Sequence, residues 1–240
     1  MPTPIRHPAD QIHYPYDDGQ PVAESDFQLN PLIYAVEALR GYFRDREDIY
    51  VAGNMFLYYE EGNPKVVVAP DVFVVIGAPR RDRFSYMLWK EPKAPDFVLE
   101  VTSRSTRSED QGPKRGVYAF LGIGEYWQYD PTGDYLSPPL QGFRLVDGNY
   151  QPLPAGVAAG GAYSLHSAVL GLDLRLEDGV LWFYETGSGT KLLTYQESER
   201  LRREAEARAS SEAARRQAAE ARVAELEAQL RRLQSGRGDG

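Results

Sequence analysis

Apolar residues that recur every three or four positions predict a helix near the start of the chain. Residues 1–23 are rich in Pro, Asp and Tyr and are expected to form an irregular arm. Glu24, Ser25 and Asp26 then precede the periodic positions Phe27, Leu29, Leu32, Ile33, Val36, Leu39, Tyr42 and Phe43. This spacing predicts an amphipathic helix, with Ser25 or Asp26 as its N-cap.

Runs of β-branched and aromatic residues predict strands after this helix. Residues 50–59 and 65–76 are separated by turn-forming residues, so together they predict one hairpin. Residues 77–94 are basic and contain Pro, which predicts an irregular loop, and residues 96–103 predict a third strand. The sheet is therefore expected to contain at least three strands before the middle of the chain.

A strand–helix–strand unit is predicted next. Residues 107–121 have a helical pattern, but Gly112 and Pro113 stand in its early part. Because Pro is tolerated only in the first turn, the regular helix is expected to begin near Gly112. Residues 125–130 predict the following strand. A unit of this length is expected to be a right-handed crossover between two parallel strands.

The remainder of the chain has two characters. Residues 131–194 predict a β-rich extension of the same domain, with short strands at 143–146, 150–153, 170–176 and 180–184. Residues 195–233 contain no Pro or Gly and predict a long solvated helix, in which Val223, Leu226, Leu230 and Leu233 form a short coiled-coil seam. The expected organisation is an arm over 1–23, an α/β domain over 24–194 and a charged helix with a frayed tail over 195–240.

Composition and charge exclude several classes of function. The 240 residues include no Cys, which excludes disulfides, zinc–thiolate sites and cysteine nucleophiles. The three histidines are scattered, so a histidine metal centre has no support. No apolar run is long enough for a membrane span and the N-terminus does not resemble a signal peptide, so we expect a cytoplasmic protein with no membrane partner. The net charge of −8 argues against a chain that coats nucleic acid, but a bound cation would reverse the sign locally.

Four polar residues interrupt or follow these apolar segments: Asp71, Glu100, Thr102 and Lys114. Charged side chains are rarely buried unless they are paired or bind a metal. Two carboxylates, Asp71 and Glu100, on two neighbouring core strands therefore suggest a site for a divalent cation.

Phosphodiester hydrolysis is the chemistry that fits these residues. It needs a cation that polarises the phosphoryl oxygen and lowers the pKa of a bound water. Mg²⁺ takes one or two carboxylates and keeps several waters, so Asp71 and Glu100 suffice, and the Val101 carbonyl could add a third ligand. Mn²⁺ is the alternative ion. Lys114 could orient the attacking water or stabilise the developing charge.

An ordered set of motifs resembles one protein family. The set comprises Val-Ala-Pro-Asp71, Pro-Asp96-Phe-Val-Leu-Glu100-Val-Thr-Ser-Arg-Ser-Thr106, Asp110-x3-Lys114-x3-Tyr118, Glu125-Tyr126-Trp127 and Asp130-Pro131. It resembles the Uma2 family of restriction-endonuclease-like proteins, within the PD-(D/E)XK nuclease superfamily. The resemblance implies an α/β fold with a mixed β-sheet core flanked by helices. It also implies a Mg²⁺-dependent endonuclease that acts on DNA, and a homodimer, because cutting both strands requires two active sites.

The resemblance also implies roles for individual residues. Asp71 and Glu100 match the two acids that bind the metal. The superfamily's plain pattern places a lysine where Thr102 stands here, and Lys114 fits a position to which that lysine has migrated. Glu24 matches an acidic position that can join the metal shell. Gly112 and Pro113 depart from the expected pattern just before Lys114.

Several alternatives remain open. The protein could be a nuclease-fold protein that binds nucleic acid or a protein partner without cleaving, or an interaction protein that works through its coiled-coil tail. Lys114 could simply pair with Asp110, Glu24 could be a solvated first-turn carboxylate, and Asp96 is expected to cap or pair. The basic loop could contact phosphates or be only a solvated loop; its cations are Arg80, Arg81, Arg83, Lys90 and Lys93.

Overall fold

The computed structural model describes residues 12–17, 19, 25–103, 106, 108, 110 and 112–235, with the backbone alone at 159 and 230–235. The chain divides into two compact units, Met1–Leu192 and Leu193–Gly240, and each is described by itself. Most of the predicted arm, Glu24, the tail after residue 235 and the side chains of Leu230 and Leu233 lie outside the described residues.

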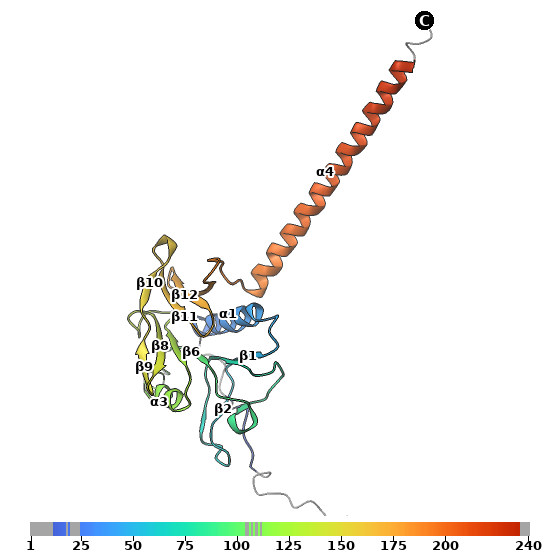
Figure 1. Ribbon diagram of the computed structural model, residues 1–240. Coiled ribbons are helices and arrows are strands. Elements are labelled where there is room, and N and C mark those ends of the chain that lie inside the picture. Colours follow the sequence, from blue (N-terminus) through green and yellow to red (C-terminus); the bar gives the residue numbers. More distant parts are fainter. Residues whose placement is uncertain are drawn as a thin grey trace, which may run out of the picture. The chain divides into compact units, whose positions relative to one another are not determined.

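A six-stranded mixed sheet forms the centre of the first unit (Figure 1). Every neighbouring pair is antiparallel except β6 and β7, which are parallel. Helix α3 lies between β6 and β7 in the sequence, so the predicted strand–helix–strand unit with two parallel strands is confirmed. In order across the sheet the strands are β1 (Ile49–Gly53), β4 (Val72–Ile76), β6 (Phe97–Val101), β7 (Glu125–Tyr129), β8 (Leu140–Val146) and β9 (Asn149–Pro152).

The two faces of this sheet belong to two separate cores. Helix α1 (Asp26–Tyr42) packs on one face, where its apolar side chains join those of Leu99 and Trp127. Helix α3 (Pro113–Phe120) contributes Tyr118 to the other core, with Val98 and Tyr126. Because side chains alternate along a strand, Glu100 lies on the α3 face. The predicted fold class, a mixed β-sheet core flanked by helices, is confirmed.

The predicted hairpin over 50–59 and 65–76 is confirmed as antiparallel pairing of the two segments, but it is interrupted and divided between two sheets. Only β1 and β4 pair in the central sheet, whereas β2 (Leu57–Tyr58) and β3 (Val67–Val68) form a second sheet with β5 (Tyr86–Met87). Asn54 breaks the first strand because its φ of 45° is left-handed, and its N–H donates to the Asp71 carbonyl. Pro70, which has no N–H to donate, breaks the second. The break places Asp71 at the residue before β4 rather than inside a strand.

The loop predicted over 77–94 contains β5 and a short 3₁₀ helix, η2 (Leu88–Lys90). The predicted β-rich extension is also divided between two sheets, since β8 and β9 complete the central sheet. The later strands form a four-stranded antiparallel sheet in chain order: β10 (Ala155–Val157), β11 (Tyr163–Ser167), β12 (Leu172–Glu177) and β13 (Val180–Glu185), with η3 (Ala159–Gly161) after β10.

Glu125 joins this four-stranded sheet to the central one. Its buried carboxylate accepts hydrogen bonds from the Ser167 hydroxyl (2.5 Å) and the Ala168 N–H (3.0 Å). The Arg144 guanidinium pairs with the same carboxylate at 3.2 Å. Because its oxygens are satisfied in this way, Glu125 is a structural acid, on the sheet face opposite Glu100.

The second unit contains helix α4 (Tyr195–Ser235). Ion pairs one turn apart, such as Arg216–Glu220 at 2.9 Å, support an exposed helix. Val223 and Leu226 are exposed, so the coiled-coil seam stays a prediction. Among the described residues, no helix has both the length and the apolar character that crossing a membrane requires.

Gly142 provides a test of how closely the central sheet is packed. A Cβ atom at this position would lie 2.8 Å from Cζ3 of the buried Trp127 ring. We therefore expect Gly142→Ala to lower the free energy of unfolding by about 1–3 kcal/mol. The control is Gly116→Ala in α3, where a Cβ meets nothing within 4 Å, and it should stabilise by about 0.5–1 kcal/mol. Urea unfolding measures both, and equal midpoints for the two variants would contradict this packing.

Candidate active site

The central sheet brings Asp71 and Glu100 together. Strands β4 and β6 are antiparallel with Val72 opposite Leu99, so the preceding Asp71 lies beside the following Glu100. The Asp71 N–H donates to Glu100 Oε2 at 3.3 Å, and the Val101 N–H donates to Asp71 Oδ2 at 2.7 Å. Glu100 is fully buried, whereas Asp71 is partly exposed. Asp71 therefore lies nearer the surface than Glu100.

Lys114 reaches this pair from the first turn of α3. Pro113 occupies the start of the helix, where its missing N–H costs nothing, and Lys114 follows directly. Lys114 Nζ lies 3.2 Å from Glu100 Oε2 and 3.0 Å from Asp110 Oδ1. Lys114 therefore forms the expected pair with Asp110 and also contacts Glu100, and its catalytic role stays a prediction.

Asp110 and Tyr118 are two site residues whose importance the sequence analysis did not recognise. Asp110 is the third carboxylate of the site and is only 1% exposed, and the Lys114 ammonium bridges it to Glu100. The Tyr118 hydroxyl donates to Glu100 Oε1. Tyr118 follows Lys114 by four residues, a spacing that places both on one helix face and could have indicated this contact.

Gln128 was also missed. It lies opposite Glu100 in the β6–β7 register and is 2% exposed. Its Nε2 and the Thr102 Oγ1 are buried atoms without a hydrogen-bond partner among the described residues. Gln128 interrupts an otherwise aromatic strand, so the signal that revealed Glu100 could have revealed it too. Buried polar atoms without partners are rare in proteins, and here they lie on the sheet face that carries the acid pair.

The charges of these groups strongly perturb one another. Burial raises the pKa of Glu100 to about 8, partly opposed by Lys114 and reinforced by Asp71 and Asp110. Burial likewise raises the pKa of Asp71. Burial works to lower the pKa of Lys114, but Glu100, Asp110 and Asp71 together raise it above its ordinary value. Three carboxyl groups therefore share one ammonium, and the surplus negative charge favours a proton or a second cation.

The donor set suits a hard cation. Asp71 and Glu100 offer carboxylate oxygens, and the backbone of Val101 adjoins them. Oxygen ligands of this kind suit Mg²⁺ or Mn²⁺ rather than zinc. Within the described part of the chain, no group of three or more acidic or histidine side chains is arranged to hold a metal. The residues therefore fit an ion that keeps most of its ligands as water. Glu24, the predicted extra ligand, lies outside the described residues.

Other candidates from the sequence lie elsewhere. Asp96 accepts the Ile76 N–H at 2.8 Å and pairs with Lys93, so its predicted pairing role is confirmed. In the basic loop, Arg81 and Arg83 both pair with Glu91. With the Lys93–Asp96 pair, three of the loop's five cations are therefore paired, and they share two carboxylates.

Comparisons with known proteins identify a family. The model of the family described as "Uma2: Putative restriction endonuclease" matches residues 4–177. A solved structure from Anabaena variabilis, titled a putative nuclease belonging to DUF820, is similar with 14% sequence identity and a TM-score of 0.43. The match covers 60% of this chain and 78% of that chain. No curated protein matches.

The raised pKa of Glu100 predicts a pH-dependent stability. The folded state holds a proton on Glu100 up to about pH 8, whereas the unfolded glutamate releases it near 4.5. The stabilisation from this proton is therefore complete below about 4.5 and is lost as pH rises through about 8. Glu100→Gln removes this loss, so its free energy of unfolding should rise relative to wild type between pH 5 and pH 8.5.

Urea unfolding with a chelator present, at several pH values, measures this difference. The control is Glu61→Gln, which changes an exposed glutamate and should give a constant offset from wild type. A Glu100→Gln offset that does not change with pH would show that the Glu100 carboxyl ionises as an ordinary glutamate does.

Proposed function

The chain belongs to the Uma2 family, described as putative restriction endonucleases, and we propose that it is a divalent-metal-dependent endonuclease that hydrolyses DNA phosphodiester bonds. One observation carries this proposal. Asp71 and the fully buried Glu100 form an acid pair in the central sheet, and the ammonium of Lys114 contacts Glu100. Two acids can hold a cation for phosphodiester hydrolysis, and a lysine beside them can stabilise the charge that develops on the phosphate.

In this proposal Asp71 and Glu100 hold Mg²⁺ or Mn²⁺ through carboxylate oxygens, and the Val101 carbonyl is a third ligand. When bound, the cation polarises the phosphoryl oxygen and lowers the pKa of the attacking water. The Val101 N–H fixes one oxygen of Asp71, which restricts the orientation of this carboxylate. The partial exposure of Asp71 leaves a side from which a substrate phosphate can approach.

Lys114 supplies the positive charge that the superfamily's plain pattern places at Thr102. A threonine hydroxyl carries no charge, so Thr102 cannot replace a lysine there. Because the surrounding carboxylates raise its pKa, Lys114 stays protonated at neutral pH. It therefore acts as a fixed ammonium that orients the attacking water or stabilises the charge that develops on the phosphate. Asp110 and Tyr118 act as positioning residues, Asp110 for Lys114 and Tyr118 for Glu100.

Two further parts of the proposal concern assembly. The nuclease domain comprises residues 24–194, and the segment of residues 195–240, a charged helix with a frayed tail, joins two copies through a seam that includes Val223 and Leu226. These two apolar side chains are exposed on α4, which supports self-association. A homodimer would supply the two active sites that cutting both strands of a duplex requires.

A second candidate function is a nuclease-fold protein that binds nucleic acid or a partner without cleaving it. The ion pair between Lys114 and Glu100 favours this candidate, because a lysine can neutralise an acid that would otherwise bind a metal. In the endonuclease a divalent cation displaces Lys114 from Glu100, whereas in the non-cleaving protein the ion pair between Lys114 and Glu100 persists.

The test combines calorimetric titration of Mg²⁺ or Mn²⁺ with a plasmid-nicking assay. We expect wild type to bind the ion and nick supercoiled DNA, and a chelator to abolish nicking. Asp71→Asn/Glu100→Gln should lose ion binding and at least ~10³-fold in nicking rate, since both metal ligands are gone. Lys114→Met should keep ion binding but lose about 10²–10³-fold in rate.

The matched control, Glu61→Gln/Asp134→Asn, removes two exposed carboxylates and should change neither measurement. Ion binding without nicking of DNA would support the non-cleaving candidate. Absence of ion binding in wild type would contradict the proposed site itself.

A further inference from the structure

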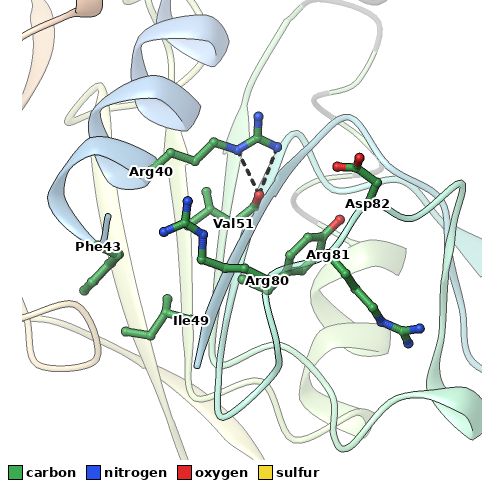
Figure 2. A pocket seen from close by; sticks show the side chains of 8 residues that line it. Arg40, Phe43, Ile49, Val51, Arg80, Arg81 and Asp82 are labelled. Atoms are coloured by element: carbon green, nitrogen blue, oxygen red, sulfur yellow. Dashed lines mark hydrogen bonds between the residues drawn. The ribbon is translucent and has the colours of Figure 1, made fainter. Parts of the chain in front are cut away.

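A second site lies against the edge strand of the central sheet. A pocket of about 440 Å³ lies between β1, the C-terminal part of α1 and the loop of residues 80–82 (Figure 2). Arg40, Arg80 and Arg81 line it, together with the carboxylate of Asp82. None of these residues belongs to the Asp71–Glu100 site.

Arg40 is held in one orientation by the edge strand. Its Nε and Nη2 both donate to the Val51 carbonyl, at 3.1 and 3.0 Å. Strand β1 has a sheet neighbour on one side only, so the arginine satisfies an edge carbonyl. Its Nη1 has no hydrogen-bond partner among the described residues and retains its donors for a ligand.

Arg80 is fixed in a similar way. Its Nη1 donates to the Arg44 carbonyl at 2.7 Å, and its backbone N–H donates to the Glu47 carbonyl at 3.1 Å. Both bonds anchor the loop to the segment that follows α1. In Figure 2 the guanidinium of Arg81 points away from those of Arg40 and Arg80.

Arg40 and Arg80 differ from the neighbouring Arg81 and Arg83 in their ion pairing. Arg81 and Arg83 share the carboxylate of Glu91. In the part of the chain that the structure describes, neither Arg40 nor Arg80 forms an ion pair with a carboxylate. Both therefore bond to neutral carbonyls, and of the residues that line the pocket only Asp82 carries a carboxylate. Guanidinium groups with free donors bind phosphate oxygens in the bidentate manner that favours arginine over lysine.

We propose that this pocket binds a backbone phosphate of the nucleic acid, a few nucleotides from the bond that is cleaved. The choice of nucleic acid as ligand rests on the proposed function. Strand β1 connects the two places, because Val51 lies at the pocket and Gly53, two residues on, pairs with Val72 next to Asp71. Two residues of a strand span about 7 Å and neighbouring strands lie about 4.8 Å apart, and each strand of a duplex rises about 3.4 Å per nucleotide.

The experiment measures binding separately from cleavage. All variants are made in the full-length Asp71→Asn/Glu100→Gln background, which cannot cut by the proposed mechanism. Fluorescence anisotropy then gives the Kd for labelled DNA and RNA duplexes with 5′-hydroxyl ends, over a range of NaCl concentrations. Such duplexes contain only diester phosphates, so a site for a terminal phosphate would not respond.

Arg40→Gln/Arg80→Gln should raise Kd at least ~10-fold and lower the slope of log Kd against log salt by about 2. The matched control is Arg203→Gln/Arg215→Gln, which removes two exposed charges from α4 and should leave the slope unchanged. Equal salt slopes for the two double variants would contradict the proposed phosphate site. So would an Asp71→Asn/Glu100→Gln protein that binds neither the DNA nor the RNA duplex.

Asp82→Asn is a control that distinguishes a loss of phosphate binding from unfolding of the protein. Removing this carboxylate from the pocket wall should tighten binding several-fold, which damage to the fold cannot do; no tightening would count against the proposal. The outcome for the proposed function is separate. If wild type cleaves DNA but binding does not depend on Arg40 and Arg80, only the phosphate site is contradicted. If binding depends on these arginines but wild type does not cleave, only the endonuclease function is contradicted.

Discussion

The ammonium of Lys114 is the interaction on which the rest of the site depends. Glu100 is buried in the middle of a six-stranded sheet, where an uncompensated carboxylate would be very costly. Lys114 compensates it at 3.2 Å and also pairs with the buried Asp110 at 3.0 Å. This contact requires α3 to begin where it does, directly at Pro113, and requires β6 and β7 to be joined by that helix.

The same interaction leaves the site short of positive charge. One ammonium faces three carboxyl groups, and burial raises the pKa of both Asp71 and Glu100. A cation or a proton is therefore favoured at the acid pair, and oxygen donors direct the choice of metal towards Mg²⁺ or Mn²⁺. The proposed phosphate pocket has the opposite sign, with Arg40 and Arg80 at the edge strand. A polyanion bound along β1 would thus place one phosphate at the arginines and another at the acid pair.

Much of this arrangement could be predicted from the sequence, because buried strands reveal polar residues that interrupt them. Asp71 and Glu100 stood out for that reason, and the resemblance to the Uma2 family placed Lys114 near them. The broken hairpin could not be predicted, since it depends on the left-handed Asn54 and its bond to Asp71. The burial of Asp110 and the place of Gln128 beside Glu100 depend on tertiary packing and strand register, which local patterns do not specify. The catalytic and metal-binding roles of these residues stay predictions.

The central claim is that a divalent cation binds between Asp71 and Glu100. The most direct measurement is anomalous X-ray diffraction from crystals of the full chain soaked in MnCl₂. The account predicts a manganese peak about 2.0–2.5 Å from an oxygen of each carboxylate, with the Lys114 ammonium moved away from Glu100 Oε2. An intact Lys114–Glu100 ion pair with no manganese at Asp71 would contradict it.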